Sequence, residues 1–336
     1  MGKRRVKTKL PSVSHVIART MGRLFLFDDD DKDEMRHLLG IVAGFCGVTI
    51  ITYALMSHHI HLLIRCDGEC HADEEELIRR YGILYSNEKT QELRTRWKML
   101  REEGKLKELQ REQDRLRRRM WDISAFMKLL KQLWTHNYNR RHEWDGTIWG
   151  GRFKSLLVAP ESILAVLCYI DLNCVRAGCS PTPGEYPWCG FAEAMGPYGI
   201  GRSGEIDCRA ELLKLYNADM TVDHPKDILS KHYLRYYQPC FSLGSLPAKF
   251  WDKDGQYIGP DLSPQHFFRC RNGYFTKGTL IGNRKSLEKL FPEVRYAFGP
   301  RRKTCARKIR GCKALEKELY VARDLRKMVL CRPLLV

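Results

Sequence analysis

Two short apolar runs, residues 48–55 and 59–66, restrict the fold of this 336-residue chain more than any other feature. Both runs are rich in β-branched and other apolar residues, and only residues 56–58 separate them. Two strand-like runs joined by so short a break predict an antiparallel β-hairpin. A hairpin needs further strands and covering helices, so the flanking segments must supply them.

The segments around the hairpin follow a regular order of strand and helix patterns. The acidic run Asp28–Asp31 precedes a helical pattern that reaches about Gly44, and aspartates suit the N-terminus of a helix. Other expected elements are a strand at 12–20, an amphipathic helix at 123–138, a strand at 153–158 and a helix from 160 to about 173. The first six elements predict an α+β fold, a ferredoxin-like antiparallel sheet with helices on one face.

A highly charged segment, residues 67–121, separates the hairpin from the next core helix. Its apolar residues, such as Leu93, Trp97 and Leu100, recur at helical spacing, and its basic and acidic residues nearly balance. We therefore expect a charged helical insertion of one or two helices, a solvated arm with no chemistry of its own.

The net charge of +18 favours a polyanionic partner, and nucleic acid is the commonest one inside cells. From Thr276 to Val336 there are 17 Lys and Arg against 5 Asp and Glu, with aromatic residues among them. Residues 201–336 are therefore expected to form a basic C-terminal region that binds DNA, with Arg301, Arg302 and Lys303 among its contacts. The segment 278–282 is interpreted as a turn, followed by a helix from Asn283 to Phe291.

The sequence argues against several other classes of protein. No apolar stretch approaches the length of a membrane span, and no apolar segment follows the basic start, so we expect a cytoplasmic, nucleoid-associated protein. The thirteen cysteines are odd in number and irregularly spaced, which disfavours a disulfide framework. Cys66 and Cys70 lack the second pair that a zinc ribbon would need.

His59 and His61 are two residues apart on a predicted strand, so their side chains leave the same face. Two adjacent imidazoles suit a metal ion but leave coordination positions unfilled. His58 points to the opposite face and is not expected to be a ligand. A His-x-His pair on a strand is more often incidental than catalytic, so it is informative only together with other groups.

Tyr169 and Asn173 are four residues apart on a predicted helix and therefore lie about one turn apart on one side. A tyrosine hydroxyl could serve as a nucleophile and the amide as a third, oxygen ligand. With the two histidines, this set suits phosphodiester cleavage, in which Mg²⁺ or Mn²⁺ polarises the phosphate and a covalent phosphotyrosine preserves the bond energy for rejoining.

These residues lie in segments that resemble the single-tyrosine HUH transposases, in particular their REP-associated branch. M-S-H-H-I-H-L-L-I at 56–64 resembles the family's M-P-N-H-V-H-L-L-L, and C-Y-I-D-L-N-C-V-R-A-G at 168–178 resembles R-Y-I-H-L-N-P-V-R-A-G. W-G-G-R-F-K-S-L-L-V at 149–158 and E-Y-P-W at 185–188 match the flanking segments. The matches are collinear and, apart from the insertion, cover about residues 10–196.

The resemblance implies that residues 1–200 form an HUH nuclease domain. His59, His61 and Asn173 would bind Mg²⁺ or Mn²⁺, and Tyr169 would form a 5′-phosphotyrosine and free a 3′-hydroxyl. The substrate would be single-stranded DNA beside a short hairpin, and the protein would act as a monomer or homodimer. Basic residues expected to contact DNA are Arg152, Lys154, Arg176, Arg140 and Arg141, although surface ion pairs are an equal alternative for such residues.

Ser57 and His58 replace the family's usual Pro-Asn, and Cys174 replaces its usual proline. Proline would help to end the helix at that position, so we expect a looser or longer helix end here. None of these changes removes a catalytic group. Two alternatives stay open: a non-catalytic nucleic-acid-binding regulator derived from such a transposase, and a metal hydrolase that uses water. The hydrolase would need acidic ligands near the histidines, which the sequence does not offer.

Overall fold

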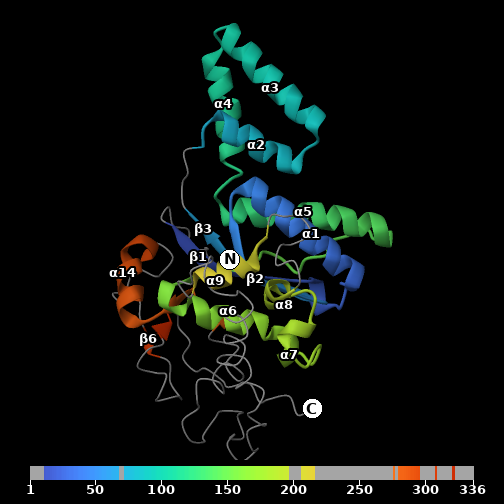
Figure 1. Ribbon diagram of the computed structural model, residues 1–336, viewed down its shortest axis with the longest axis vertical. Coiled ribbons are helices and arrows are strands. Elements are labelled where there is room, and N and C mark those ends of the chain that lie inside the picture. The colour runs from blue at the N-terminus through green and yellow to red at the C-terminus, as the bar shows by residue number, and fades with distance from the viewer. Residues whose placement is uncertain are drawn as a thin grey trace, which may run out of the picture.

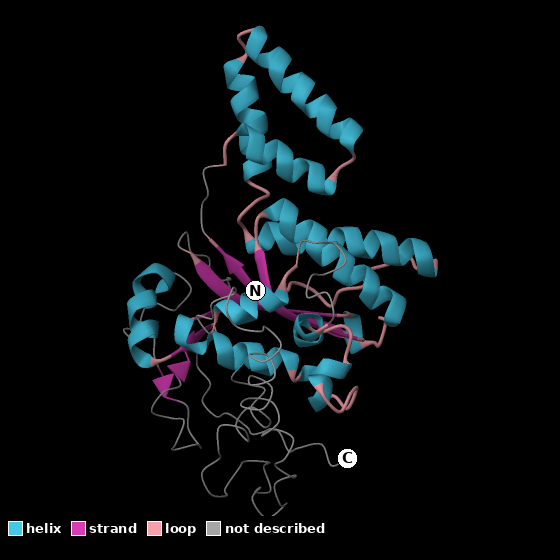
Figure 2. Cartoon of the chain, viewed as in Figure 1, coloured by secondary structure: helices cyan, strands magenta, loops and turns pink. Residues whose placement is uncertain are grey.

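The structure, a computed structural model, describes residues 11–67, 72–196, 206–215, 275–276, 279–295, 307–308 and 320–321. Its central unit is built from four strands and two helices in the order β1-α1-β2-β3-α5-β4 (Figures 1 and 2). Their bounds are Ser12–Arg19 for β1, Asp29–Cys46 for α1, Thr49–Met56 for β2, His59–Cys66 for β3, Ile123–His142 for α5 and Lys154–Val158 for β4.

The four strands lie in the order β2-β3-β1-β4, and each neighbouring pair is antiparallel. β1 therefore occupies the centre, where Ile17 pairs with His61 of β3 and with Lys154 of β4. Within the described residues the sheet continues through β5, β7 and β6 beyond β4. The strand order and directions are those of a ferredoxin-like sheet, so the predicted α+β class and its fold are confirmed.

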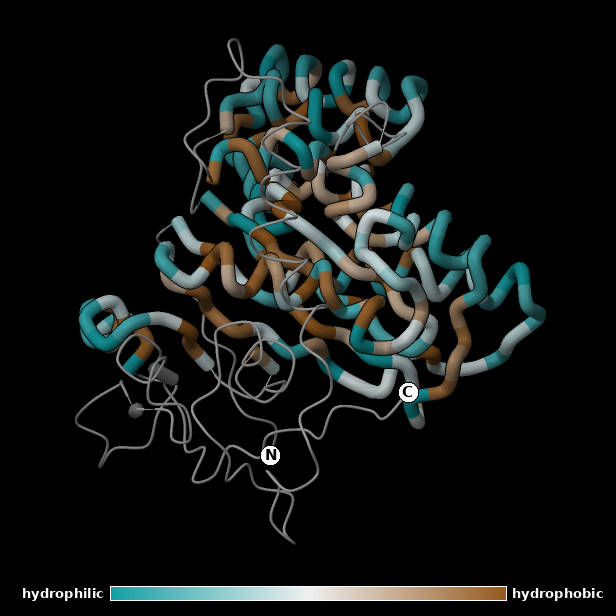
Figure 3. Tube along the Cα trace, turned by 60° about the horizontal axis from the view of Figure 1, so that its bottom comes forward, coloured by the Kyte–Doolittle hydropathy of each residue, from teal (hydrophilic) through white to brown (hydrophobic). Residues whose placement is uncertain are grey.

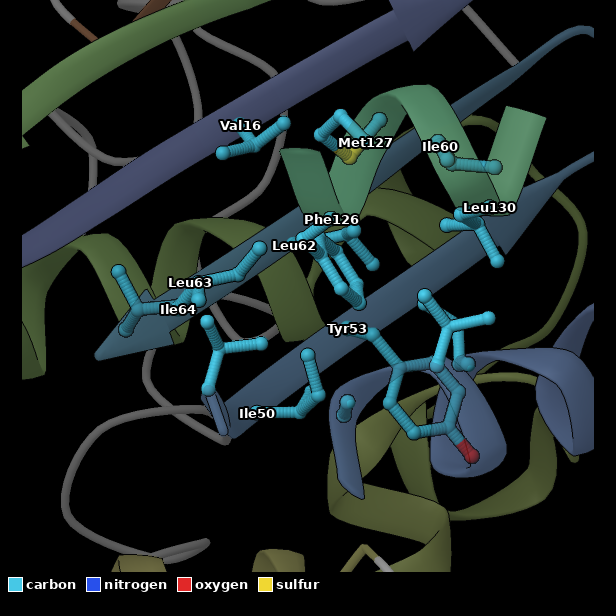
Figure 4. Close-up of a cluster of buried hydrophobic side chains, with 14 of the residues drawn as sticks. Val16, Ile50, Tyr53, Ile60, Leu62, Leu63, Ile64, Phe126, Met127 and Leu130 are labelled. Atoms are coloured by element: carbon cyan, nitrogen blue, oxygen red, sulfur yellow. The ribbon is translucent and has the colours of Figure 1, made fainter. Parts of the chain in front are cut away.

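The strand alternation gives the sheet two different faces. Even-numbered residues of β3, such as Ile60 and Leu62, lie in the apolar core beside Phe126, Met127 and Leu130 of α5 (Figure 4). α1 packs against both α5 and β2 on this face. Helix α1 begins where predicted, because the Asp28 side chain accepts from the Asp31 backbone and Asp31 reciprocates in a capping box.

Odd-numbered residues of β3 face a second helical layer, formed by the chain after β4. This layer contains α6 (Ile163–Asp171), which packs on β2 and β3, and it is therefore the layer that meets His59 and His61. The rest of the described chain after β4 forms η2 (Pro160–Ser162), α7 (Asn173–Arg176), η3 (Pro183–Glu185), α8 (Gly190–Met195) and α9 (Cys208–Lys214). α8 begins beside the outer edge of β2, where Cys189 forms a bridge with Ala54. The two helices of the split βαβ unit thus share one face, and the tyrosine helix covers the other (Figure 1).

The charged insertion forms three helices rather than one or two, and they project as an arm (Figure 1). The helices are α2 (Glu74–Leu84), α3 (Asn87–Glu102) and α4 (Leu106–Arg117). Trp97 is buried between them, and its indole nitrogen donates to Glu112 at 3.0 Å. Ion pairs such as Arg96 with Glu112 cover the outside, and Figure 3 shows the hydrophilic character of the outer helices against the apolar centre.

The C-terminal part of the described chain corrects one expectation. The interpretation of 278–282 as a turn is wrong for Leu280–Gly282, which form strand β5 parallel to β4. The free edge of β4 explains this result, because the Leu157 amide donates to Thr279 and the Ala159 amide donates to Ile281. The predicted helix is confirmed as α14 (Arg284–Val294). The remaining described strands, β6 (Arg307–Lys308) and β7 (Tyr320–Val321), are two residues long.

Among the described residues, none of the helices has both the length and the apolar character needed to cross a bilayer.

Gly190, at the first position of α8, allows α8 to approach β2 closely. A Cβ atom there would lie 2.2 Å from the Thr52 hydroxyl and 3.0 Å from its Cα. We expect Gly190→Ala to lower the free energy of unfolding by about 1–3 kcal/mol, because a well-packed contact must open. Urea unfolding measures the change. Gly184→Ala is the matched control, since its nearest neighbour would be 3.9 Å away; equal stability of both variants would contradict the close approach.

Candidate functional site

β3 places His59 and His61 side by side on the face that meets α6. Their ring centroids are 4.9 Å apart, and both side chains are buried. The strand register fixes this arrangement, because the same alternation sends Ile60 and Leu62 into the apolar core. The prediction that the two imidazoles lie on the same face of the strand is therefore correct.

His15 of β1 is a third histidine at this site, and the sequence analysis did not single it out. Its Nε2 lies 2.7 Å from Nδ1 of His61, and its Nδ1 lies 2.8 Å from the carbonyl oxygen of Phe275. Because a carbonyl can only accept, His15 Nδ1 is the donor to Phe275. Neutral His15 then accepts at Nε2, so His61 carries its proton on Nδ1 and leaves Nε2 with a lone pair.

Burial keeps these histidines neutral. Desolvation lowers the pKa of both His15 and His59 to about 3 and lowers the pKa of His61 well below its usual value. After burial, neighbouring histidines lower the pKa values of His59 and His61 further, followed by Arg19 and Arg176, and Arg176 also lowers the pKa of His15. Neutral imidazole is the form that binds metal ions.

Arg19 ends β1 directly opposite His59 and is a second residue that the sequence analysis missed. Burial lowers its pKa, as does the positive charge of Arg23, whereas the electrostatic interaction with Tyr169 raises it. The guanidinium stays protonated under ordinary conditions because the usual arginine pKa is so high. Arg19 therefore contributes positive charge that acts on both the strand histidines and Tyr169.

Helices α6 and α7 bring Tyr169 and Asn173 to the same face. The Tyr169 ring centroid is 5.8 Å from that of His61 and 5.8 Å from that of His15. The Asn173 side chain hydrogen-bonds to His59. The two residues were expected on one helix, but the structure divides it at Leu172, which ends α6 and precedes α7. Leu172 still donates to Cys168 and Asn173 still accepts from Ala177, so the turn-like spacing is kept.

Two further groups, Phe275 and Arg176, pack against the Tyr169 ring. The ring stacks on Phe275 with centroids 4.3 Å apart, and the Arg176 guanidinium lies 4.0 Å above the ring. Arg176 also donates to the Tyr169 backbone carbonyl at 3.0 Å. Only 2% of Tyr169 is exposed.

The charges acting on the three histidines come from cationic side chains in the described part of the chain. A separate acidic group, Asp28, Asp31 and His142, has the composition of a cation site but lies at the start of α1. Its oxygens already accept from the helix backbone, from His142 at 2.9 Å and from Arg141. The group therefore acts as a helix cap and ion-pair network.

The other residues predicted to contact DNA differ in exposure and in whether their charge is already paired. Lys154 is exposed and pairs with Ile17, which in turn pairs with His61, and Arg152 and Arg140 are also exposed. Arg141 pairs with Asp31 and with Glu34 at 2.7 Å, so its charge is already used within the fold. Arg301, Arg302 and Lys303 lie outside the described residues, as does Cys70.

Comparison with known proteins places this geometry in context. Residues 11–103 match the family described as "Transposase IS200 like". Over this segment the chain is similar to the IS200-like transposases. The matched segment includes β1 and β3 with His15, Arg19, His59 and His61, and it ends before Tyr169.

A solved structure described as a REP-associated tyrosine transposase bound to a REP hairpin is similar to 59% of this chain and 87% of its own. The sequence identity is 13% and the TM-score is 0.39. No curated protein matches the chain.

Proposed function

We propose that this transposase relative is a metal-dependent DNA endonuclease that cleaves and rejoins single-stranded DNA beside hairpins through a 5′-phosphotyrosine at Tyr169. The observation that carries the proposal is the convergence of His59 and His61 from β3 with Tyr169 from α6 at one buried, cationic position. The domain that performs this chemistry is residues 1–200, and residues 201–336 add DNA-binding capacity through their positive charge.

The donor set fits a divalent cation. His59 Nδ1 is buried and has no hydrogen-bond partner among the described residues, and the tautomer inferred for His61 leaves a lone pair on its Nε2. Asn173, which already contacts His59, offers the third ligand through its amide oxygen. Two imidazoles and one amide accept either Mg²⁺ or Mn²⁺ and leave positions for substrate. When bound, the ion would polarise a non-bridging phosphate oxygen.

The remaining steps use groups of this chain. Tyr169 Oη attacks the phosphorus and releases its proton to water as the bond to the 3′-oxygen breaks. That oxygen takes a proton from water and leaves as a 3′-hydroxyl. The tyrosyl ester keeps the bond energy, so attack by a 3′-hydroxyl can reverse the step. Arg176 holds the Tyr169 backbone and ring, and Arg19 and Lys154 supply positive charge for the phosphate.

The test is direct formation of a covalent protein–DNA adduct. The protein is incubated with labelled single-stranded DNA that contains a hairpin, in the presence of Mn²⁺ or of EDTA, and separated on a denaturing gel. The proposal predicts an adduct with Mn²⁺ and none with EDTA, and none on a fully paired duplex of the same sequence. Absence of an adduct across a library of hairpins would contradict it.

His15 is expected to orient His61 without touching the metal. His15→Ala removes the acceptor that fixes the His61 tautomer, so the affinity for Mn²⁺ should fall by about 10- to 100-fold. His15→Gln, whose side-chain oxygen can accept the same hydrogen bond, should restore much of the affinity. Calorimetric titration of Mn²⁺ measures both variants. Equal losses in the two variants would show that His15 only fills space.

The second candidate is a non-catalytic nucleic-acid-binding regulator. The enclosure of Tyr169 by Phe275 and Arg176 favours it, because a regulator does not need an accessible hydroxyl. The same assay separates the two functions. A regulator would bind the hairpin DNA in a native gel, with or without metal, and would form no covalent adduct.

A further inference from the structure

A basic groove lies on the face of the sheet that α5 covers, opposite the face that carries the histidines. It has a volume of about 750 Å³ and is formed by α5 and the segment 147–153. Its apolar lining is Met127, Trp149 and Phe153, and its basic lining is Lys128, Lys131, His136 and Arg152. The other lining residues are Ser124, Gln132, Thr135, Thr147 and Gly151, so no carboxylate lines it among the described residues.

The groove is built into the fold rather than formed by flexible surface chains. Trp149 packs against Trp134 and Phe27, with ring centroids 5.4 and 5.6 Å away, and its indole nitrogen donates to Thr135 at 3.1 Å. Lys131 donates to the Gly151 carbonyl at 2.8 Å and thereby ties α5 to the facing segment. These contacts hold an apolar floor in place beneath a basic rim.

The charged residues of α5, like those that line the groove, are all basic. Its twenty residues contain Lys128, Lys131, Arg140 and Arg141 and not one Asp or Glu. Arg141 is neutralised by α1, but Lys128 and Arg152 are exposed at the groove. A rim of this sign attracts phosphate groups, and an apolar floor accepts the faces or edges of unpaired bases.

The groove is also connected to the proposed active site through one short backbone segment. The Gly150 amide donates to the Arg19 carbonyl at 2.9 Å, and Thr20 bridges to Trp149. Arg19 pairs with His59, so its side chain lies on the face of the sheet that carries the histidines, opposite the face covered by α5. A Cβ at Gly150 would lie 2.8 Å from the Thr20 carbonyl oxygen, so this close approach needs glycine. A strand in the groove would therefore leave it next to the cationic end of β1.

We propose that this groove binds a single-stranded segment of DNA, with its phosphates on Lys128 and Arg152 and a base over the apolar floor. The inference extends the proposed function by assigning a second contact for the substrate strand, outside the metal site. Single-stranded DNA is favoured over duplex because the apolar floor of the groove can receive unpaired bases, which a duplex keeps stacked inside.

Binding is measured without chemistry, which separates this inference from the proposed function. Fluorescence anisotropy follows a labelled single strand of about 12 nucleotides binding to the full chain carrying Tyr169→Phe, in EDTA, over a range of salt concentrations. The test variant adds Lys128→Ala and Arg152→Ala. The matched control adds Lys107→Ala and Arg111→Ala, two exposed cations of the arm. A further variant, Gln132→Trp, fills the groove without changing charge.

The groove proposal predicts that the Lys128/Arg152 variant binds about 25-fold more weakly at 0.1 M salt, because a slope of about 0.7 per phosphate contact is worth about fivefold for each. The magnitude of the salt slope should fall by about 1.4, and the arm variant should bind like its parent. Gln132→Trp should weaken binding at an unchanged slope. The inference is overturned if the groove and arm variants behave alike, if Gln132→Trp binds normally, or if duplex binding suffers the same loss.

Discussion

Replacing Tyr169 with phenylalanine is expected to abolish the covalent attachment of DNA while leaving the protein folded. The substitution removes only the hydroxyl that the proposed reaction uses as its nucleophile. Stacking on Phe275 and the Arg176 contact use the ring and the backbone carbonyl, so both should persist in the variant. The adduct yield should therefore fall by on the order of 10³-fold or more.

The control for this substitution is Tyr138→Phe, which also removes one tyrosine hydroxyl. Tyr138 lies on α5 and its hydroxyl donates to the Leu26 carbonyl, away from the histidines. Thermal unfolding of both variants checks that the fold is retained. If Tyr169→Phe formed the adduct at the wild-type rate, the nucleophile would have to be another group.

Removal of either strand histidine should have the second-largest effect. His59→Ala and His61→Ala each delete one of the proposed ligands, and the affinity for Mn²⁺ should fall by at least about 100-fold, since even residues that only support a ligand contribute about 10- to 100-fold. Adduct formation should fall in parallel. Titration calorimetry measures metal binding, and the denaturing gel measures the adduct.

The matched control is His37→Ala, because His37 is an exposed histidine of α1. It should bind Mn²⁺ like the wild type. A different outcome is informative for the metal site itself. If His59→Ala and His61→Ala retained normal metal affinity, the ion would have to bind elsewhere, and the acidic group at Asp28 and Asp31 would be the place to examine.

Much of the core fold could be predicted from the sequence, because the patterns that indicate these elements lie within short segments. The hairpin 49–66, the aspartate cap of α1 and the alternation of β3 each depend on neighbouring residues, and all three agree with the structure. The same local reasoning predicted that His59 and His61 share one face of β3, which the structure shows. It underestimated the insertion, because turns between charged helices resemble the helices in composition.

What the sequence could not provide depends on contacts between distant segments. His15 and Arg19 join the site only because β1 pairs with β3, and that register is a property of the folded sheet. The predicted ferredoxin-like strand order does make β1 and β3 neighbours, so residues on the same face of β1 were the signal that could have revealed them. The strand at Leu280–Gly282 likewise exists because β4 offers an open edge.

The central claim is that Tyr169 becomes linked to DNA beside a His59/His61 metal site. The most direct measurement is mass-spectrometric mapping of the adduct formed with Mn²⁺ after digestion of the protein and the DNA. The account predicts a nucleotide joined through its 5′-phosphate to Tyr169, in the peptide that contains α6. A nucleotide joined to any other residue, or the absence of a linked peptide from cleaved hairpin DNA, would contradict it.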